Sequence, residues 1–263
     1  MTYETLLLDY TEADRQIAIV RLNRPDVMNA MNTRMFHEML LVQRALKDND
    51  ALRCVVLTGS GSKAFCAGGD LKERNGMSDD TWRKQHDLIE EAFLGFKNFP
   101  LPLIAAVEGH AHGGGFELAL MCDFIIASET ARLSVPEVTR GIMPGGGGIQ
   151  NLVRAAGARR AKQWILTGAA MQAQQALDWN IVNEVTPAGQ ALDRALAIAQ
   201  QITRNAPMSV RYAKMAADKG GEVDFHTGYA MDIAAYNILV SSEDRLEGVR
   251  AFNEKRAPRW MNR

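Results

Sequence analysis

Apolar and polar residues follow two different periods along the chain, and glycine or proline marks most changes from one to the other. Short β-favouring runs cover Thr5–Asp9 and Gln16–Leu22, and the polar stretch 11–15 between them predicts a hairpin. From Thr33 to Lys47 the apolar residues recur at helical spacing, and Asn32 precedes them as a candidate cap. The amino-terminal part therefore predicts a hairpin followed by an amphipathic helix.

Two further runs have the continuous apolar composition of buried strands. The first, Arg53–Thr58, ends at a Gly-Ser-rich stretch, and the second, Leu103–Val107, follows two prolines. Between them, Asp79–Lys97 has the pattern of a helix. Strands that alternate with helices need crossover connections, so we expect an α/β fold with a sheet that is at least partly parallel.

The sequence pattern changes after about residue 190, where no further strand is predicted. Four helices are predicted there, over Ala191–Arg204, Pro207–Lys219, Asp224–Leu239 and Glu243–Phe252. Their content of alanine, methionine and tyrosine exceeds what a solvated appendage needs, so we expect their apolar faces to pack on the body or on another subunit. We place a boundary near residue 200, between an α/β core at 1–200 and a helical region at 201–263.

The size and net charge of the chain limit the classes of function that we expect for it. The chain has 263 residues, 47% of them hydrophobic, and such a chain buries a substantial core without a metal or a disulfide. Its 30 basic and 31 acidic residues give a formal charge of -1, so we expect no broad attraction toward nucleic acid or an anionic membrane. A local basic patch can still bind phosphate.

The cysteines and the amino terminus indicate an intracellular protein. Cys54, Cys66 and Cys122 have no spacing to one another or to histidine that suggests zinc. The segment Met1–Tyr10 has acidic residues around its leucines and lacks the basic-then-apolar order of a signal peptide. No apolar run approaches the roughly 20 residues that a bilayer crossing needs. We therefore expect a soluble, cytoplasmic protein without a bound metal.

The first stretch with candidate chemistry follows the strand that is predicted to end at Thr58. Adjacent Gly68 and Gly69 let the backbone turn sharply and approach a ligand, although an ordinary turn explains them as well. Gly59–Ala64 also matches the G-x-G-x-x-G/A pattern of a dinucleotide site. That site needs a helix to begin at once, and the two later glycines interrupt the segment, so we reject this interpretation. Cys66 has no sequence signature for an activating base, so a neutral buried thiol is expected.

A triple glycine, Gly113–Gly115, lies after the second predicted strand and before a segment that predicts a helix. A strand-to-helix junction of this kind exposes peptide N–H groups at the positive end of the helix dipole, which suits an anion or a developing oxyanion. Glu117 falls in the first turn, where the dipole is expected to stabilise its ionised form. A helix-capping carboxylate is the alternative interpretation of Glu117.

A third stretch combines a carboxylate with more glycines. Pro136 fixes its own φ and leaves Glu137 at the edge of a strand or the start of a short turn. A surface carboxylate paired with Arg140 is the alternative interpretation of Glu137. Four consecutive glycines follow Pro144, and they indicate positive φ or close backbone packing before a helix that starts near Ile149.

Taken in order, these motifs resemble the enoyl-CoA hydratase/isomerase (crotonase) family, and the likeness runs nearly from end to end. The motifs are Asn23-Arg24-Pro25 with Asn29-Ala30, Ala67-Gly68-Gly69-Asp70-Leu71-Lys72, Gly113-Gly114-Gly115-Phe116-Glu117, Pro136-Glu137, Pro144-Gly145-Gly146-Gly147-Gly148, and Glu243-Asp244-Arg245 with Glu247-Gly248. The resemblance implies a crotonase-like spiral of ββα units. It also implies a C-terminal helical region that builds a homotrimer, often stacked into a homohexamer.

The same resemblance assigns roles to individual residues. It places an oxyanion hole at the backbone N–H groups of Gly69 and Gly114. It makes Glu117 the main base that activates water and Glu137 the group that supplies the α-carbon proton, with the roles exchanged in dehydration. The CoA-binding residues that it implies are Ala30, Ala67, Gly69, Asp70, Leu71, Lys72, Phe252 and Lys255. The last two would lie near the adenine or phosphate end, from the same or a neighbouring subunit.

The implied activity is reversible hydration of a 2-enoyl-CoA to a 3-hydroxyacyl-CoA through an enolate held in the oxyanion hole, with no cofactor besides the CoA thioester substrate. Double-bond isomerisation, another acyl-CoA hydrolase or lyase reaction, and non-catalytic CoA binding are the alternatives. The chain departs from the family pattern at Glu108, where asparagine is common, and at Phe116, where a smaller residue is frequent. His110 and His112 are either packed side chains or additional polar groups of the site.

Overall fold

The chain folds into two β-sheets, and successive strands in the central part of the chain alternate between them. The computed structural model describes residues 3–11 and 15–263. In these ranges the larger sheet has six strands in the order β1-β2-β3-β5-β7-β10, and every neighbouring pair except β1–β2 is parallel. Its strands are β1 (Leu6–Tyr10), β2 (Ile17–Leu22), β3 (Cys54–Gly59), β5 (Leu103–Val107), β7 (Phe124–Ser128) and β10 (Glu184–Thr186).

The smaller sheet has β4, β6 and β8 in parallel, with β9 antiparallel at its edge. Its strands are β4 (Ala64–Cys66), β6 (His110–His112), β8 (Arg132–Ser134) and β9 (Met171–Gln172). Each of the pairs β3–β4, β5–β6 and β7–β8 contributes one strand to each sheet, and a helical segment follows each pair. The chain therefore winds as ββα units, which confirms the predicted α/β class and the crotonase-like spiral.

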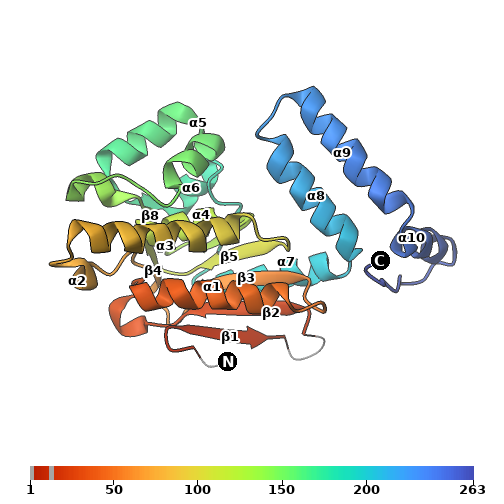
Figure 1. Cartoon of the computed structure of the whole chain (residues 1–263), viewed down its shortest axis with the longest axis horizontal. Coiled ribbons are helices and arrows are strands. Elements are labelled where there is room, and N and C mark those ends of the chain that lie inside the picture. The colour runs from red at the N-terminus through yellow and green to blue at the C-terminus, as the bar shows by residue number, and fades with distance from the viewer. Residues whose placement is uncertain (1–2, 12–14) are drawn as a thin grey trace.

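Helices cover both faces of the larger sheet (Figure 1). α1 (Thr33–Lys47) and α3 (Asp79–Lys97) share the main hydrophobic core with one face, where the rings of Phe36 and Phe93 meet edge to face at 6.4 Å. α7 (Ala191–Thr203) packs its alanines on the alternate strand residues, which point to the other face. The remaining helical segments of this body are η1 (Pro25–Val27), α2 (Leu71–Arg74), α4 (Gly114–Leu120), η2 (Pro136–Arg140), α5 (Gly148–Thr167) and α6 (Ala173–Asp178).

Two long helices have the bounds that the sequence predicts, and the predicted helices after residue 190 differ from the observed ones by one residue at one or both ends. α1 begins at Thr33 and ends at Lys47, and the side-chain oxygen of its cap, Asn32, accepts a hydrogen bond from the amide of Met35 at 3.0 Å. α3 also has its predicted bounds. The predicted hairpin is the antiparallel pair β1–β2, although residues 12–14 of its connection lie outside the described residues.

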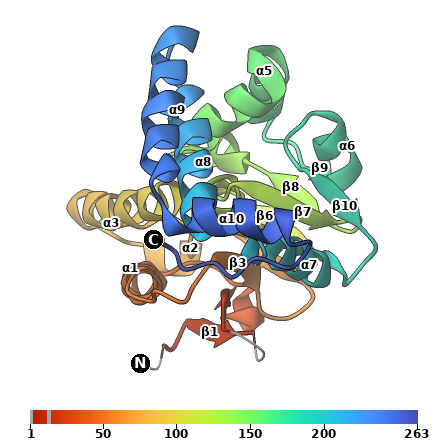
Figure 2. The ribbon, with the colours of Figure 1, turned by 90° about the vertical axis from the view of Figure 1, so that its right-hand side faces the viewer.

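The carboxyl-terminal helices continue from α7 with α8 (Pro207–Gly220), α9 (Phe225–Val240) and α10 (Glu243–Asn253). α8 and α9 lie side by side and project from the body (Figures 1 and 2). An ion pair between Lys214 and Asp123 ties α8 to the start of β7, and the indole of Trp260 donates to the carbonyl of Arg204 at 2.7 Å. The division into two domains near residue 200 stays a prediction.

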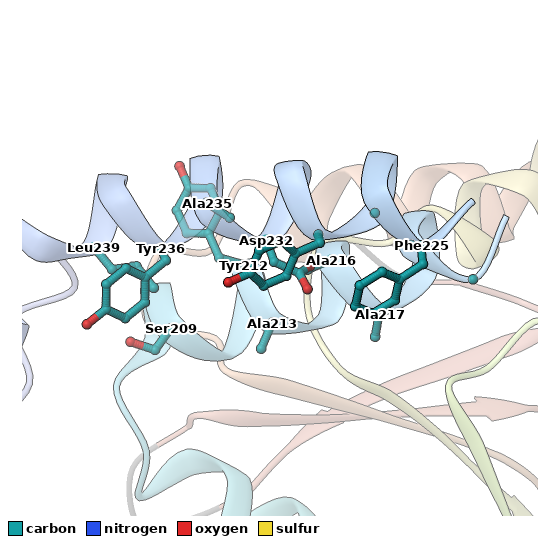
Figure 3. A pocket seen from close by; sticks show the side chains of 14 residues that line it. Ser209, Tyr212, Ala213, Ala216, Ala217, Phe225, Asp232, Ala235, Tyr236 and Leu239 are labelled. Atoms are coloured by element: carbon teal, nitrogen blue, oxygen red, sulfur yellow. The ribbon is translucent and has the colours of Figure 1, made fainter. Parts of the chain in front are cut away.

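α9 is apolar around most of its circumference, and it nevertheless exposes large side chains. Phe225 is 78% exposed and Tyr236 is 65% exposed, and both line an apolar groove between α8 and α9 (Figure 3). A helix of this composition is normally buried, so the single chain leaves apolar surface uncovered here. Within residues 3–11 and 15–263, none of the helices combines the length and the apolar composition that crossing a membrane requires.

Candidate active site

The parallel strands of the smaller sheet end at the wall of a cavity of about 920 Å³. The segments after β4, β6 and β8 form this wall, and they contribute residues 67–69, 113–114 and 136–137. These segments are far apart in the sequence but meet here, because the carboxyl ends of parallel strands lie at the same sheet edge. One face of α3 also lines the cavity, with Trp82, His86, Ile89 and Phe93.

The backbone amides of Gly69 and Gly114 lie at the cavity wall and have no hydrogen-bond acceptor in the described part of the chain. The Met31 amide donates to the carbonyl of Gly68 at 2.8 Å, and the Met31 carbonyl accepts from the amide of Asp70 at 2.8 Å. The Gly69 amide, which lies between these two bonds, has no acceptor in the described residues. The Gly114 amide begins α4 and is one of the unpaired N–H groups of that helix.

The two free amides lie next to each other. A Cβ built on Gly114 would lie 4.0 Å from the Gly69 nitrogen, and one built on Gly68 would lie 3.5 Å from the Gly114 nitrogen. Gly68 has a φ of +101°, and its absent side chain would meet the carbonyl oxygen of His112 at 2.8 Å. The backbones approach this closely only because glycine stands at 68, and this brings the two free amide nitrogens close together.

Glu117 extends from the first turn of α4 and is 3% exposed. Its Oε1 accepts hydrogen bonds from the amides of Gly146 and Gly148, both at 2.9 Å. No donor of the described residues bonds its Oε2, so that oxygen is available to a ligand in the cavity. Burial, opposed by the two amides and reinforced by Glu137, raises the pKa of Glu117 to about 7.

The helix dipole was expected to favour the ionised form of Glu117, and thus to lower its pKa. The structure shows the opposite net effect, because the pKa of Glu117 is raised. A helix dipole contributes about 0.3–1 kcal/mol at an exposed position. Burial of a carboxyl group shifts its pKa by up to several units, each about 1.4 kcal/mol, and α4 has only seven residues. Desolvation is therefore the larger effect at this position.

Glu137 lies in η2 and faces the same cavity. Its Oε2 is buried without a hydrogen-bond partner in the described residues, and a Cβ on Gly113 would lie 2.8 Å from its Oε1. Burial raises the pKa of Glu137, while Arg140 acts in the opposite direction through space. The carboxyl group of Glu137 therefore lies beside Gly113, directly before the free amide of Gly114.

The run of four glycines after Pro144 supports Glu117, a role that the sequence did not reveal. Only Gly147 of the four has a positive φ, +86°. A Cβ on Gly146 would lie 3.0 Å from Oε2 of Glu117, and one on Gly148 would lie 2.8 Å from Oε1. Close packing around the carboxylate thus explains two of these glycines, and the sequence signal was the glycine run without its partner.

The departures from the family pattern have structural explanations. The carboxylate of Glu108 accepts hydrogen bonds from the amides of Gly189 at 3.2 Å and Ala191 at 3.0 Å, so it caps α7. His112 lines the cavity, but its Nε2 contacts Nδ1 of His110 at 2.9 Å and its Nδ1 contacts the Ser134 hydroxyl at 2.7 Å. Both ring nitrogens of His112 are therefore already paired, and burial lowers its pKa.

Phe116 and Cys66 are packing residues. Phe116 is fully buried and its ring lies 5.4 Å from that of Trp164, which fixes α4 against α5. Burial raises the pKa of the Cys66 thiol to about 12, as expected for a neutral thiol. Within the described residues no group of histidine, cysteine and acidic side chains is arranged to hold a metal ion.

Of the predicted CoA-binding residues, the structure brings some to the cavity and not others. Ala67, Gly69 and Leu71 line it. Its lining within the described residues does not include Ala30, Asp70, Lys72, Phe252 or Lys255. Asp70 caps α2 and accepts from Arg24 at 2.8 Å, an ion pair that lowers its pKa against the effect of burial. The CoA-binding roles stay predictions.

Comparison with known proteins gives consistent results over the whole chain. The sequence model described as enoyl-CoA hydratase/isomerase matches residues 12–263. The chain is 38% identical over 245 residues to the short-chain-enoyl-CoA hydratase of Clostridium acetobutylicum, covering 93% of this chain and 94% of that protein. It is 36% identical over 249 residues to the 2,3-dehydroadipyl-CoA hydratase of Escherichia coli, covering 95% and 96%. The crystal structure of an enoyl-CoA hydratase from Bacillus anthracis superposes with a TM-score of 0.96 at 40% identity, covering 99% and 100%.

Proposed function

The chain belongs to the enoyl-CoA hydratase/isomerase family, and on that premise we propose that it is a hydro-lyase that adds water reversibly to a 2-enoyl-CoA, giving a 3-hydroxyacyl-CoA. The observation that supports this most directly is the convergence of two free amides, the buried carboxyl group of Glu117 and the half-buried one of Glu137 at one cavity wall. The acyl group is a separate question, since the two hydratases named above differ in the substrate that their names state.

In the proposed mechanism the thioester oxygen lies between the amides of Gly69 and Gly114. These donors stabilise the negative charge that develops when water adds to the β-carbon, and loss of one such donor costs about 2.7–4 kcal/mol in a typical case. Glu117 takes a proton from the water through its free Oε2, and Glu137 gives a proton to the α-carbon. The reaction needs no metal or redox cofactor.

We further propose a homotrimer, or a hexamer of stacked trimers, that forms through the carboxyl-terminal helices. The uncovered apolar surface of α9 supports an interface there. α10 lies at the opposite end of the molecule from α2 (Figure 1), and Phe252 on α10 is 84% exposed. Phe252 and Lys255 would therefore reach CoA from a neighbouring subunit. Sedimentation velocity tests the proposal, and a monomer at micromolar concentration would contradict it.

We place this chemistry in the cytoplasm. The three cysteines are free and buried, which suits a reducing compartment.

The hydration assay follows the loss of absorbance of the conjugated thioester with purified protein and a panel of 2-enoyl-CoAs. Glu117→Gln and Glu137→Gln are each expected to lower kcat at least about a hundredfold, with unchanged circular dichroism. A near-wild-type rate in either variant would remove that residue from the mechanism. Conversion of a 3-enoyl-CoA into a 2-enoyl-CoA without hydration, and without need of Glu117, would instead identify an isomerase.

A further inference from the structure

A guanidinium group lies beside the proposed oxyanion hole. Arg74 is the last residue of α2 and lines the cavity. A Cβ built on Gly69 would lie 3.2 Å from both Cζ and a terminal nitrogen of Arg74. The positive charge is thus next to the residue whose amide is proposed to hold the thioester oxygen.

The position of this guanidinium is fixed by neighbours that leave its outer edge free. Nε of Arg74 donates to the side-chain oxygen of Gln85 at 2.8 Å, and Cζ lies 4.5 Å from the centre of the Trp82 ring. Gln85 is 4% exposed, and its nitrogen donates to the Thr33 hydroxyl at 2.8 Å and to Glu73 at 2.9 Å. A buried, fully paired amide therefore orients Arg74.

No carboxylate of the described residues pairs with Arg74. Its two terminal nitrogens have no hydrogen-bond acceptor there, and the adjacent Glu73 is used by the Thr33 amide and by Gln85. Arg83, a second cation of the cavity, differs because it is exposed and contacts Asp79 and Asp80. Four N–H donors of Arg74 thus remain for a ligand, and burial lowers the pKa of its guanidinium against the opposing charge of the adjacent Glu73.

We propose that Arg74 is a specificity-determining residue that binds a carboxylate on the acyl chain, so that the preferred substrate is a CoA monothioester of an unsaturated dicarboxylic acid. This inference rests on the proposed function, because the thioester oxygen must lie at Gly69. A guanidinium edge matches a carboxylate through two parallel hydrogen bonds. The phosphates of CoA are the other anions of the substrate, but the whole pantetheine arm separates them from the thioester.

The experiment compares two 2-enoyl-CoAs with the same number of carbons, one ending in a methyl group and one in a carboxylate. For the wild-type protein we expect kcat/KM to be at least about tenfold higher for the carboxylate, as a charged hydrogen bond is typically worth a factor of about 10 to 100. Arg74→Met should lower kcat/KM about 10- to 100-fold for the carboxylate substrate and less than about threefold for the methyl substrate. Arg74→Lys keeps the positive charge but lacks the two parallel N–H donors. Its kcat/KM for the carboxylate substrate should therefore lie between those of the wild type and Arg74→Met.

Arg83→Gln is the matched control, because it also removes one positive charge from the cavity and should leave the ratio of the two kcat/KM values unchanged. Equal rates on both substrates in the wild type would overturn the inference. An equal loss on both substrates in Arg74→Met would also overturn it, because Arg74 would then position the Gly69 loop or bind CoA itself.

A binding measurement separates this inference from the proposed function. Isothermal titration uses the saturated analogues of the two thioesters, which cannot be hydrated. Tighter binding of the carboxylate analogue, lost in Arg74→Met, supports the inference even if neither unsaturated substrate reacts, in which case the proposed hydration alone fails. Equal binding of both analogues overturns the inference even if hydration is observed.

Discussion

Replacing Glu117 by glutamine is expected to stabilise the protein above neutral pH, although it removes the proposed base. Burial raises the pKa of Glu117 from 4.5 to about 7 in the folded state. Between these two values the folded protein binds more protons at this position than the unfolded chain does. Stability therefore falls as the pH rises through this window, because the folded protein then has to bury a carboxylate.

The size of the effect follows from the shift. A change from 4.5 to about 7 is about 2.5 pKa units, or about 3 kcal/mol. The cost is absent below about pH 4.5, grows between pH 4.5 and 7, and is nearly complete above pH 7. Glutamine does not ionise, and its oxygen still accepts from Gly146 and Gly148. We expect its free energy of unfolding to exceed that of the wild type by up to about 3 kcal/mol at pH 8 and by about 1 kcal/mol or less at pH 5.

Urea denaturation at several pH values between 5 and 8 measures this difference, with the protein concentration held constant in case subunits dissociate. Glu91→Gln is the control, since Glu91 is an exposed glutamate of α3 and its replacement changes a solvated side chain instead of a buried one. A difference between Glu117→Gln and wild type that stays constant across this range would refute the reasoning. So would a variant that is less stable than the wild type at pH 8.

Three further outcomes test other features of the structure. For hydration, kcat/KM should fall as the pH rises above about 7, because the pair of Glu117 and Glu137 then loses the one proton that it must give to carbon, and a rate that keeps rising above pH 7 would contradict this coupling. Gly115→Ala should lower the melting temperature by several degrees, because its Cβ would lie 2.3 Å from the carbonyl oxygen of Cys66. Gly141→Ala has open space and only a positive φ to strain it, so an equal loss there would contradict the steric argument. The Cys66 thiol should resist iodoacetamide until urea unfolds the protein, and rapid labelling of folded protein would contradict its burial.

Long elements with one apolar face could be predicted from the sequence. The bounds of α1 and α3 follow from helical spacing, to which the cap Asn32 adds a local signal for α1. β5 could be predicted because its five residues are all buried and form a continuous apolar run. The signals that predict these elements lie within each element's own sequence and do not depend on distant residues.

The smaller sheet could not be predicted in this way. Its strands have only two or three residues each, too few to show an alternating pattern, and their pairing is set by the connections between the two sheets. β7 was missed as well, although Phe124–Ser128 is an apolar run that could have been recognised as a strand. The site lies at the end of the smaller sheet, so its geometry depends on the elements with the weakest sequence signals.

Within the site, the types of residue were visible but their partners were not. The glycine run at 145–148 indicated close packing, yet only the fold shows that two of its amides hold Oε1 of Glu117. Arg74 gave no signal in the sequence, because an arginine at the end of a short helix is usually solvated. Its significance comes from Gln85, which lies 11 positions away and directs its guanidinium.

The protonation state that hydration needs arises from this same tertiary arrangement. One carboxyl group must take a proton from water while another gives one to carbon, so the pair must hold one proton between them. Burial raises the pKa of both Glu117 and Glu137, and ionisation of Glu137 further disfavours ionisation of Glu117. Near neutral pH this coupling favours the singly protonated pair over the doubly ionised one. Neither glutamate would have that property on the surface, so the cavity, rather than the residue type, makes the two carboxyl groups suitable for the reaction.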